Sequence, residues 1–137
     1  MGDLTKNFSL LEFTCRCGCE IPQDVLDNIK IVAEQLQIVR NKLNKAIKIN
    51  SAYRCPKHNE MIGGAHKIVN GKRIETSQHV LGKAADIVVT GMSPNGVFGF
   101  MNKLMALDMI KLGGLGQYNT FTHFDIRGYI ARWDNRS

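Results

Sequence analysis

Three residues in the second half of the sequence have the side chains of metal ligands. His79 lies in a loop that leads to Gly82, and Asp86 lies inside the apolar run Ala-Ala-Asp-Ile-Val-Val. His123 lies in a later segment in which polar and apolar residues alternate. A carboxylate among apolar neighbours is costly to bury without a cation or hydrogen-bond donors. Two imidazoles and one carboxylate form a common ligand set for catalytic zinc, with water as the fourth ligand.

Each of these residues also has an ordinary interpretation when it is taken alone. Asp86 could be satisfied by backbone amides or by an arginine, and His123 could be a hydrogen-bonded histidine of the core. One metal site would explain both polar residues on apolar strands together. The spacing alone leaves the two interpretations open.

The elements that must position these residues follow from hydrophobic periodicity. Apolar residues recur at steps of three and four from Val25 to Leu43, which predicts an amphipathic helix of about twenty residues. A second helix should begin at Ser93-Pro94 and reach about Leu112. Apolar runs or alternation with a period of two predict strands at 47–54, 84–89 and 120–127. On the last strand, Asp125 should share a face with His123.

A hairpin is predicted between the first two strands of the chain's core. Asn70-Gly71 stands between two β-prone triplets, and both residues tolerate the positive φ of a tight hairpin turn. The sequence therefore predicts a two-stranded flap at about 66–76, which carries Lys67, Lys72 and Arg73. Helices and strands without a regular βαβ repeat indicate an α+β fold, with a small antiparallel sheet packed by helices. We find no linker, so we expect residues 1–137 to form a single domain.

The cysteines leave three interpretations open. Cys15, Cys17 and Cys19 are clustered, and Cys55 is remote in sequence. The four could bind a structural zinc, although spacings of one residue are shorter than usual for such sites. They could instead form one or two disulfides after export, or remain free buried thiols.

The overall composition limits the class of protein. The 137 residues carry a formal net charge of +6, which favours polyanionic partners such as nucleic acid or an anionic cell wall. The basic residues are scattered, and no aromatic residues alternate with them to form a stacking platform for single strands. We therefore expect no nucleic-acid partner. No run is long and apolar enough for a membrane span, and the N-terminus lacks the apolar region of a secretory signal, so we expect synthesis in the cytoplasm.

Several motifs together resemble one peptidase family. They are Ser-Ala-Tyr-Arg-Cys-Pro-Lys-His-Asn from residue 51, Gly-Gly-Ala from 63, Ser-x-His-x-x-Gly-x-Ala-x-Asp from 77 and Phe-Thr-His-Phe-Asp from 121. This combination, with Phe-x-Cys-x-Cys-Gly-Cys from 13, resembles the M15 family of zinc D-Ala-D-Ala carboxypeptidases and related phage endolysins, and in particular its first subfamily, branch A. The resemblance covers about residues 8–127.

The resemblance implies a fold and residue roles. The fold would be of the hedgehog/DD-peptidase type, and the domain a zinc peptidase domain that acts on bacterial peptidoglycan. His79, Asp86 and His123 would hold one catalytic zinc. Arg54 would bind or polarise the substrate near the scissile carbonyl, and Ser77 would contact the substrate.

The sequence departs from the family pattern at the general base. Many relatives have a glutamate three residues before the last histidine ligand, where this chain has Thr120. Related endopeptidases have a histidine two or five residues before that ligand, where this chain has Phe121 and Tyr118. Asp125 is the remaining candidate, either as the base or as a residue that orients a ligand.

We therefore expect a monomeric zinc peptidase that cleaves a bond in peptidoglycan, as a D,D-carboxypeptidase or an endopeptidase, and that reaches the cell wall after release from the cytoplasm. A phage or prophage lytic enzyme fits the small size. The alternative is a non-catalytic, zinc-stabilised module that binds the cell wall.

Overall fold

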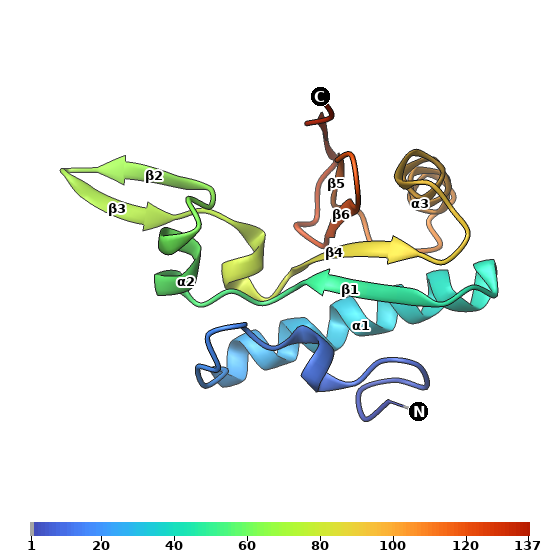
Figure 1. Ribbon diagram of the computed structural model, residues 1–137, viewed down its shortest axis with the longest axis horizontal. Helices are drawn as coiled ribbons and strands as arrows, with labels where there is room; N and C mark the ends of the chain where they lie inside the picture. The colour runs from blue at the N-terminus through green and yellow to red at the C-terminus, as the bar shows by residue number, and fades with distance from the viewer. Residues whose placement is uncertain (1) are drawn as a thin grey trace.

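The computed structural model describes residues 2–137, with Glu75 described by its backbone alone. The helices are η1 (Leu10–Phe13), α1 (Gln23–Leu43), α2 (Pro56–Met61), η2 (Gln78–Leu81) and α3 (Pro94–Ala106). The strands are β1 (Ile47–Ser51), β2 (His66–Val69), β3 (Lys72–Glu75), β4 (Ala84–Val89), β5 (Gly114–Gln117), β6 (Thr122–Asp125) and β7 (Ala131–Asp134). Figure 1 shows α1 beneath the long strands β1 and β4, and the β2–β3 hairpin extending away from them. The predicted α+β fold is confirmed.

Helix α1 forms one wall of the core. Its predicted apolar stripe is buried at Val25, Ile29, Val32, Leu36 and Val39, and the last three side chains are fully inaccessible to solvent. Burial of such a stripe supplies most of a helix's stability in a folded protein. The helix ends at Asn44, whose backbone is left-handed.

The main sheet has five strands in the order β1-β4-β6-β5-β7. Strand β4 pairs antiparallel with both β1 and β6, and its residues Ala84, Ala85, Ile87 and Val89 are almost fully buried. A register shift between Ile49 and Ser51 places Ser51 opposite Asp86. Such an irregularity bends the strand locally.

Two strands of this sheet were not predicted. Strand β5 contains the segment Gly-Leu-Gly-Gln, in which glycine lowers β-propensity, and β7 pairs with it in parallel. The glycine at 116 has a packing reason, because a Cβ there would lie 2.3 Å from the indole Nε1 of Trp133. The sheet is therefore mixed, with one parallel pair at its edge.

Helix α3 is shorter than the sequence predicted. It ends at Ala106 instead of near Leu112, and Asp108 follows with a left-handed backbone at φ 58°. Residues beyond this point could not continue a right-handed helix, because a left-handed residue reverses the direction of the chain. The exposed side chains of Leu107, Met109 and Leu112 agree with this early end.

The predicted hairpin is confirmed. Strands β2 and β3 pair antiparallel from His66 opposite Glu75 to Val69 opposite Lys72, with Asn70 and Gly71 at positive φ in the turn. Figure 1 shows the hairpin projecting beyond α2, away from the main sheet. None of the described helices combines the length and the apolar character needed to cross a bilayer.

Gly82 and Gly91 both have positive φ, but only Gly82 packs against α1, so substitutions at the two positions separate backbone strain from packing against this helix. A Cβ at Gly82 (φ 73°) would lie 2.7 Å from Cγ1 and 2.8 Å from the carbonyl oxygen of Val25, whereas at Gly91 (φ 80°) it would meet only the tip of Lys45 at 3.7 Å. We expect Gly91→Ala to lower the free energy of unfolding by about 1–2 kcal/mol through backbone strain. Gly82→Ala should lower it further, because α1 must also move. Urea unfolding of both variants measures this difference, and equal losses would contradict it.

Candidate metal centre and cleft

Three predicted ligands come together on adjacent elements. Strand pairing places Asp86 of β4 directly opposite His123 of β6, and η2 brings His79 to the same point. Oδ1 of Asp86 lies 3.0 Å from Nδ1 of His123 and 3.4 Å from Nε2 of His79. One ligand atom from each of the three residues lies within 4.8 Å of the other two. The side chains are therefore close enough to hold one metal ion.

His79 is oriented by the backbone of the segment that follows β1. Its Nδ1 lies 2.6 Å from the carbonyl oxygen of Ala52. Because a carbonyl oxygen can only accept, Nδ1 carries the proton and Nε2 has its lone pair directed toward Asp86. The hydroxyl of Ser77 caps η2 by accepting a hydrogen bond from the His79 N–H at 3.2 Å. The preceding residues thus fix both the ring and the backbone of His79.

His123 is oriented from its other side by Asp125. Its Nε2 lies 2.8 Å from Oδ2 of Asp125, so the Nε2–H donates a hydrogen bond to that carboxylate and Nδ1 faces Asp86. Asp125 is fully buried and also accepts hydrogen bonds from the N–H of Gly114 at 2.7 Å and from Nε and Nη2 of Arg127 at 2.9 and 2.7 Å. The two histidines therefore present different nitrogens to the same point.

The electrostatics of this centre favour a cation. Burial raises the pKa of Asp86, but its close contacts with His123 and His79 outweigh this effect and hold the pKa well below its usual range. Burial lowers the pKa of His79 and keeps its ring neutral. Burial also acts to lower the pKa of His123, but hydrogen bonds to Asp125 and Asp86 raise it overall. The two carboxylates beside the His123 ring thus favour a positive charge at its Nδ1. A proton or a metal ion can supply this charge. These residues therefore fit a divalent cation.

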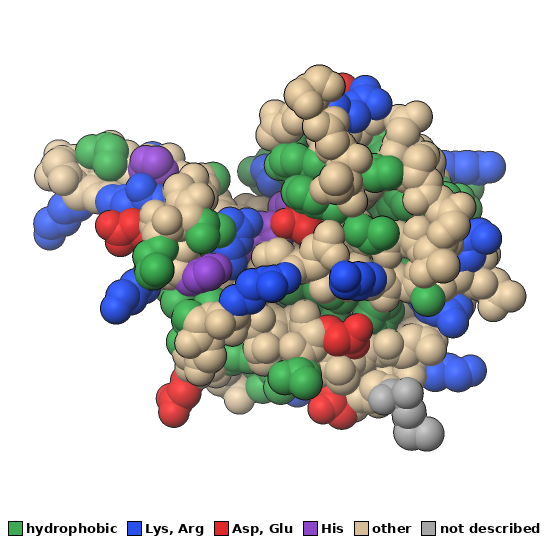
Figure 2. Space-filling view, in the orientation of Figure 1, with side chains coloured by type: hydrophobic (Ala, Val, Ile, Leu, Met, Phe, Trp, Pro, Cys, Tyr) green, Lys and Arg blue, Asp and Glu red, His purple; other side chains and the backbone are tan. Residues whose placement is uncertain are grey.

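The three residues lie in an open cleft of about 780 Å³. Figure 2 shows the surface hollowed between the projecting hairpin and the body of the molecule, with histidine and acidic side chains at its base. Gly64, Ala65 and Thr76, at the foot of the hairpin, line one side. An extended peptide segment could therefore reach the metal centre from solvent.

Aromatic side chains also line the cleft, a position that the sequence did not predict for them. The rings of Tyr118 and Phe121 stack at 4.4 Å, and Trp133 of β7 lies 4.9 Å from the His123 ring. Tyr129 also lines the cleft. Tyr118 and Phe121 thus present aromatic surface to the cleft. Only recognition of β7 could have placed Trp133 in the cleft.

Arg54 also lies in the cleft. Its backbone N–H donates to the carbonyl oxygen of His79 at 3.1 Å, and its Nη1 donates to Oδ1 of Asn59 at 3.2 Å. Its Nε is buried without a hydrogen-bond partner among the described residues. Burial lowers the pKa of Arg54, and the charge of Asp86 opposes this shift. The guanidinium therefore has unused donor capacity beside the metal centre.

Three other polar residues, at positions of the family pattern or on the hairpin, lie outside the metal centre. Thr120 is exposed and does not line the cleft, and Asp86 is the one carboxylate among the described residues that does. His58 lines a separate pocket with Arg16, and His66 is exposed on the hairpin with Nδ1 3.0 Å from the carbonyl oxygen of Gly64. Neither histidine joins the metal centre.

A family model described as Peptidase M15 matches residues 6–125. The chain belongs to the peptidase M15 family. The match spans every predicted site residue, and the resemblance of the motifs to the M15 family is confirmed. A comparison with curated proteins gives no match. The M15 assignment identifies the protein as a metallopeptidase. His79, Asp86 and His123 form a group that could hold a metal ion.

The contact between Asp125 and His123 predicts an effect on metal affinity. We expect Asp125→Asn to weaken zinc binding at the M15 centre by about 10- to 100-fold, the usual effect of losing a carboxylate that orients a histidine ligand. The affinity can be measured by competition of zinc against Co²⁺, whose binding beside His123 should quench the fluorescence of Trp133, the chain's one tryptophan.

A matched control is available on β7. The carboxylate of Asp134 accepts two hydrogen bonds from the guanidinium of Arg136, as that of Asp125 does from Arg127, but Asp134 is exposed. Asp134→Asn should leave zinc affinity unchanged. An unchanged affinity in Asp125→Asn as well would show that Asp125 does not support the metal ligand.

Proposed function

We propose that this M15 peptidase holds one catalytic zinc with His79, Asp86 and His123 and hydrolyses a peptide bond in peptidoglycan stem peptides or cross-links. The observation that carries the proposal is the convergence of Nε2 of His79, Oδ1 of Asp86 and Nδ1 of His123 at the base of an open cleft. Three protein ligands with an open side are typical of catalytic zinc, whereas structural zinc has four. The three residues line the cleft that a substrate would enter, so bound substrate would lie beside the ion that they would hold.

The metal would act as a Lewis acid on the scissile carbonyl and lower the pKa of water at the same position. Arg54 would stabilise the developing negative charge or bind a carboxylate of the substrate. Its partly buried, permanently charged guanidinium and its unpartnered Nε support this role. Ser77 is buried and lines the same cleft, where its hydroxyl can meet the substrate backbone.

We assign to Asp125 the orientation of His123 instead of the role of general base. Its oxygens already accept hydrogen bonds from His123, Gly114 and Arg127, and none of its surface is exposed to the cleft. A general base must lie within hydrogen-bond reach of the proton that it removes, directly or through one water. Asp125 is instead placed to keep Nδ1 of His123 free for the metal.

The substrate class is supported by charge as well as by family. The chain's net charge of +6 favours approach to an anionic cell wall. The exposed Lys67 and Lys72 lie on the hairpin whose foot lines the cleft, so they can contact an anionic strand while a peptide branch enters. A D,D-carboxypeptidase or an endopeptidase of phage or prophage origin, released from the cytoplasm to the wall and active as a monomer within one domain, fits these features.

A non-catalytic zinc-stabilised module that binds the cell wall is the second candidate. The lack of a second carboxylate among the described residues that line the cleft favours it. Such a module would bind peptidoglycan without cleaving it, and its folding would depend on the metal at His79, Asp86 and His123.

Cleavage and its metal dependence can be tested together. We expect purified peptidoglycan fragments to lose a peptide bond on incubation with the protein, and a zinc chelator or Asp86→Asn to abolish this loss with folding largely retained. Mass spectrometry of the fragments identifies the bond. Asp24→Asn on exposed α1 surface is the control and should cleave normally. Binding without cleavage by the wild-type protein would favour the second candidate.

The role of Arg54 predicts a loss of rate. We expect Arg54→Ala to lower kcat by about 100- to 1000-fold, the usual effect of removing a donor to a developing oxyanion. Arg54→Lys should recover only part of the rate, because lysine lacks the forked donors. Initial rates on a peptidoglycan fragment measure both variants, with Arg40→Ala of α1 as the control. A normal rate for Arg54→Ala would exclude the role.

A further inference from the structure

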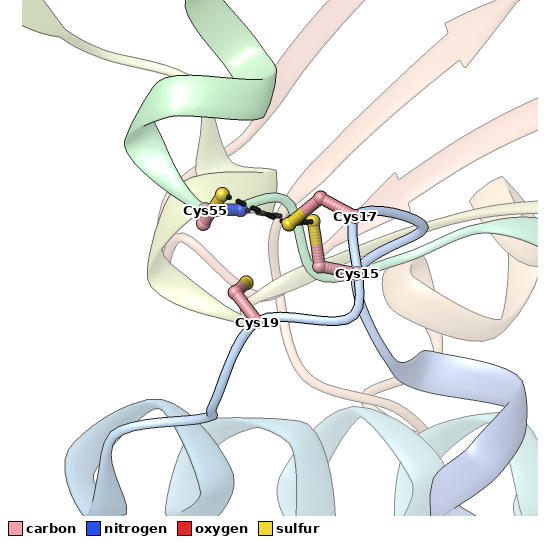
Figure 3. A group of neighbouring side chains, drawn as sticks. All are labelled: Cys15, Cys17, Cys19 and Cys55. Carbon is pink, nitrogen blue, oxygen red and sulfur yellow. Dashed lines mark hydrogen bonds between the residues drawn. The ribbon is translucent and has the colours of Figure 1, made fainter.

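A second cluster of metal-ligating side chains lies outside the catalytic cleft. Cys15, Cys17 and Cys19 come from the loop between η1 and α1, and Cys55 immediately precedes α2. Figure 3 shows the four side chains directed toward one another from the two segments. The sulfur atoms all lie within 4.8 Å of one another, with 3.1 Å between Cys15 and Cys17 and 3.3 Å between Cys17 and Cys55.

A turn in the loop explains how cysteines spaced by one residue can face one point. The N–H of Gly18 donates to the carbonyl oxygen of Cys15 at 3.0 Å, and Gly18 has a positive φ of 76°. This turn reverses the chain between Cys17 and Cys19, so that the third sulfur returns to the first two (Figure 3). The short spacing is thus compatible with a single site.

Backbone hydrogen bonds are directed at the sulfur atoms. The N–H of Cys55 donates to Sγ of Cys15 at 3.4 Å, and the N–H of His58 donates to Sγ of Cys55 at 3.4 Å. Hydrogen bonds of this kind favour the thiolate, which is the form that binds metals. They also connect the loop to the start of α2.

The arrangement favours a metal over the other two interpretations of the cysteines. All four thiols are free, and Cys17 has close contacts with both Cys15 and Cys55, whereas disulfides would divide the sulfurs into separate pairs. A tetrahedral zinc with Zn–S bonds of about 2.3 Å spaces its sulfurs about 3.8 Å apart, which is close to the observed cluster. Inert buried thiols do not fit either, because Cys17 is exposed and Cys15 alone is buried.

We propose that Cys15, Cys17, Cys19 and Cys55 bind a structural zinc ion that joins the N-terminal loop to the segment entering the catalytic cleft. Four thiolates fill the coordination sphere of zinc and leave no open position, so this site would be structural. The proposal does not depend on the protein's activity.

The segment 52–55 connects the two centres. Cys55 belongs to the cysteine cluster, the backbone of Arg54 bonds to His79, and the carbonyl of Ala52 orients the His79 ring. The N–H of Tyr53 donates to the carbonyl oxygen of Phe13, at the entrance of the cysteine loop. Zinc at the cysteines would therefore restrain the backbone that positions two residues of the cleft.

Zinc content is the direct test. Protein purified under reducing conditions should contain about two zinc ions per chain, and both Asp86→Asn and Cys17→Ser should reduce the content to about one. Cys17 is chosen because it is the exposed member, and Glu20→Ser, an exposed neighbour of the loop, should retain both ions. About one ion in the wild-type protein, unchanged in Cys17→Ser, would overturn the proposal.

A second measurement avoids dependence on a folded cysteine variant. Wild-type protein loaded with Co²⁺ should show the near-ultraviolet band of sulfur-to-cobalt charge transfer, and Asp86→Asn should keep this band. Removal of the metal should speed amide hydrogen exchange at residues 52–55. Absence of the charge-transfer band would overturn the proposal. So would disulfides in protein kept under reducing conditions, which would appear as a chain mass lower by two or four hydrogen atoms.

Discussion

The register between β4 and β6 is the constraint on which the cleft depends. Because Asp86 stands opposite His123, a slip of one residue would turn one of the two side chains to the other face of the sheet. Apolar neighbours on β4 fix this register, since Ala85 and Ile87 must remain in the core beside α1. The hydrophobic core thus sets the position of the polar groups, and the energetic cost of burying Asp86 is offset by its two histidine partners.

A second layer of contacts converts this proximity into a directed site. The carbonyl of Ala52 and the carboxylate of Asp125 each accept a hydrogen bond from the ring nitrogen that faces away from Asp86, in His79 and in His123 respectively. Asp125 is itself held by hydrogen bonds from Gly114 and Arg127. A Cβ at Gly114 would lie 2.4 Å from Oδ2 of Asp125, so the glycine leaves room for the carboxylate. The poorly β-forming strand β5 is therefore explained by what it must accommodate.

The sequence predicted those parts that depend on local pattern or on residue chemistry. The stripe of α1 and the Asn70-Gly71 hairpin were predicted from residue types and their spacing. Spacing left the convergence of His79, Asp86 and His123 open, and the resemblance to the M15 family implied it. The pair β5–β7 was missed, because β5 is rich in glycine and its partner lies beyond an intervening strand. The aromatic lining of the cleft was missed with it. The grouping of the four cysteines depended on a turn at Gly18 that spacing does not reveal.

The hydrogen bonds that fix the rings of His79 and His123 have a thermodynamic consequence. Each ring is held in one rotamer by hydrogen bonds to the protein itself, at Ala52 and at Asp125. The loss of side-chain conformational entropy therefore occurs when the chain folds and does not recur when an ion arrives. Preorganisation of this kind raises the affinity for the ion without any additional contact. It also means that the geometry of the donors is a property of the folded polypeptide, independent of occupancy.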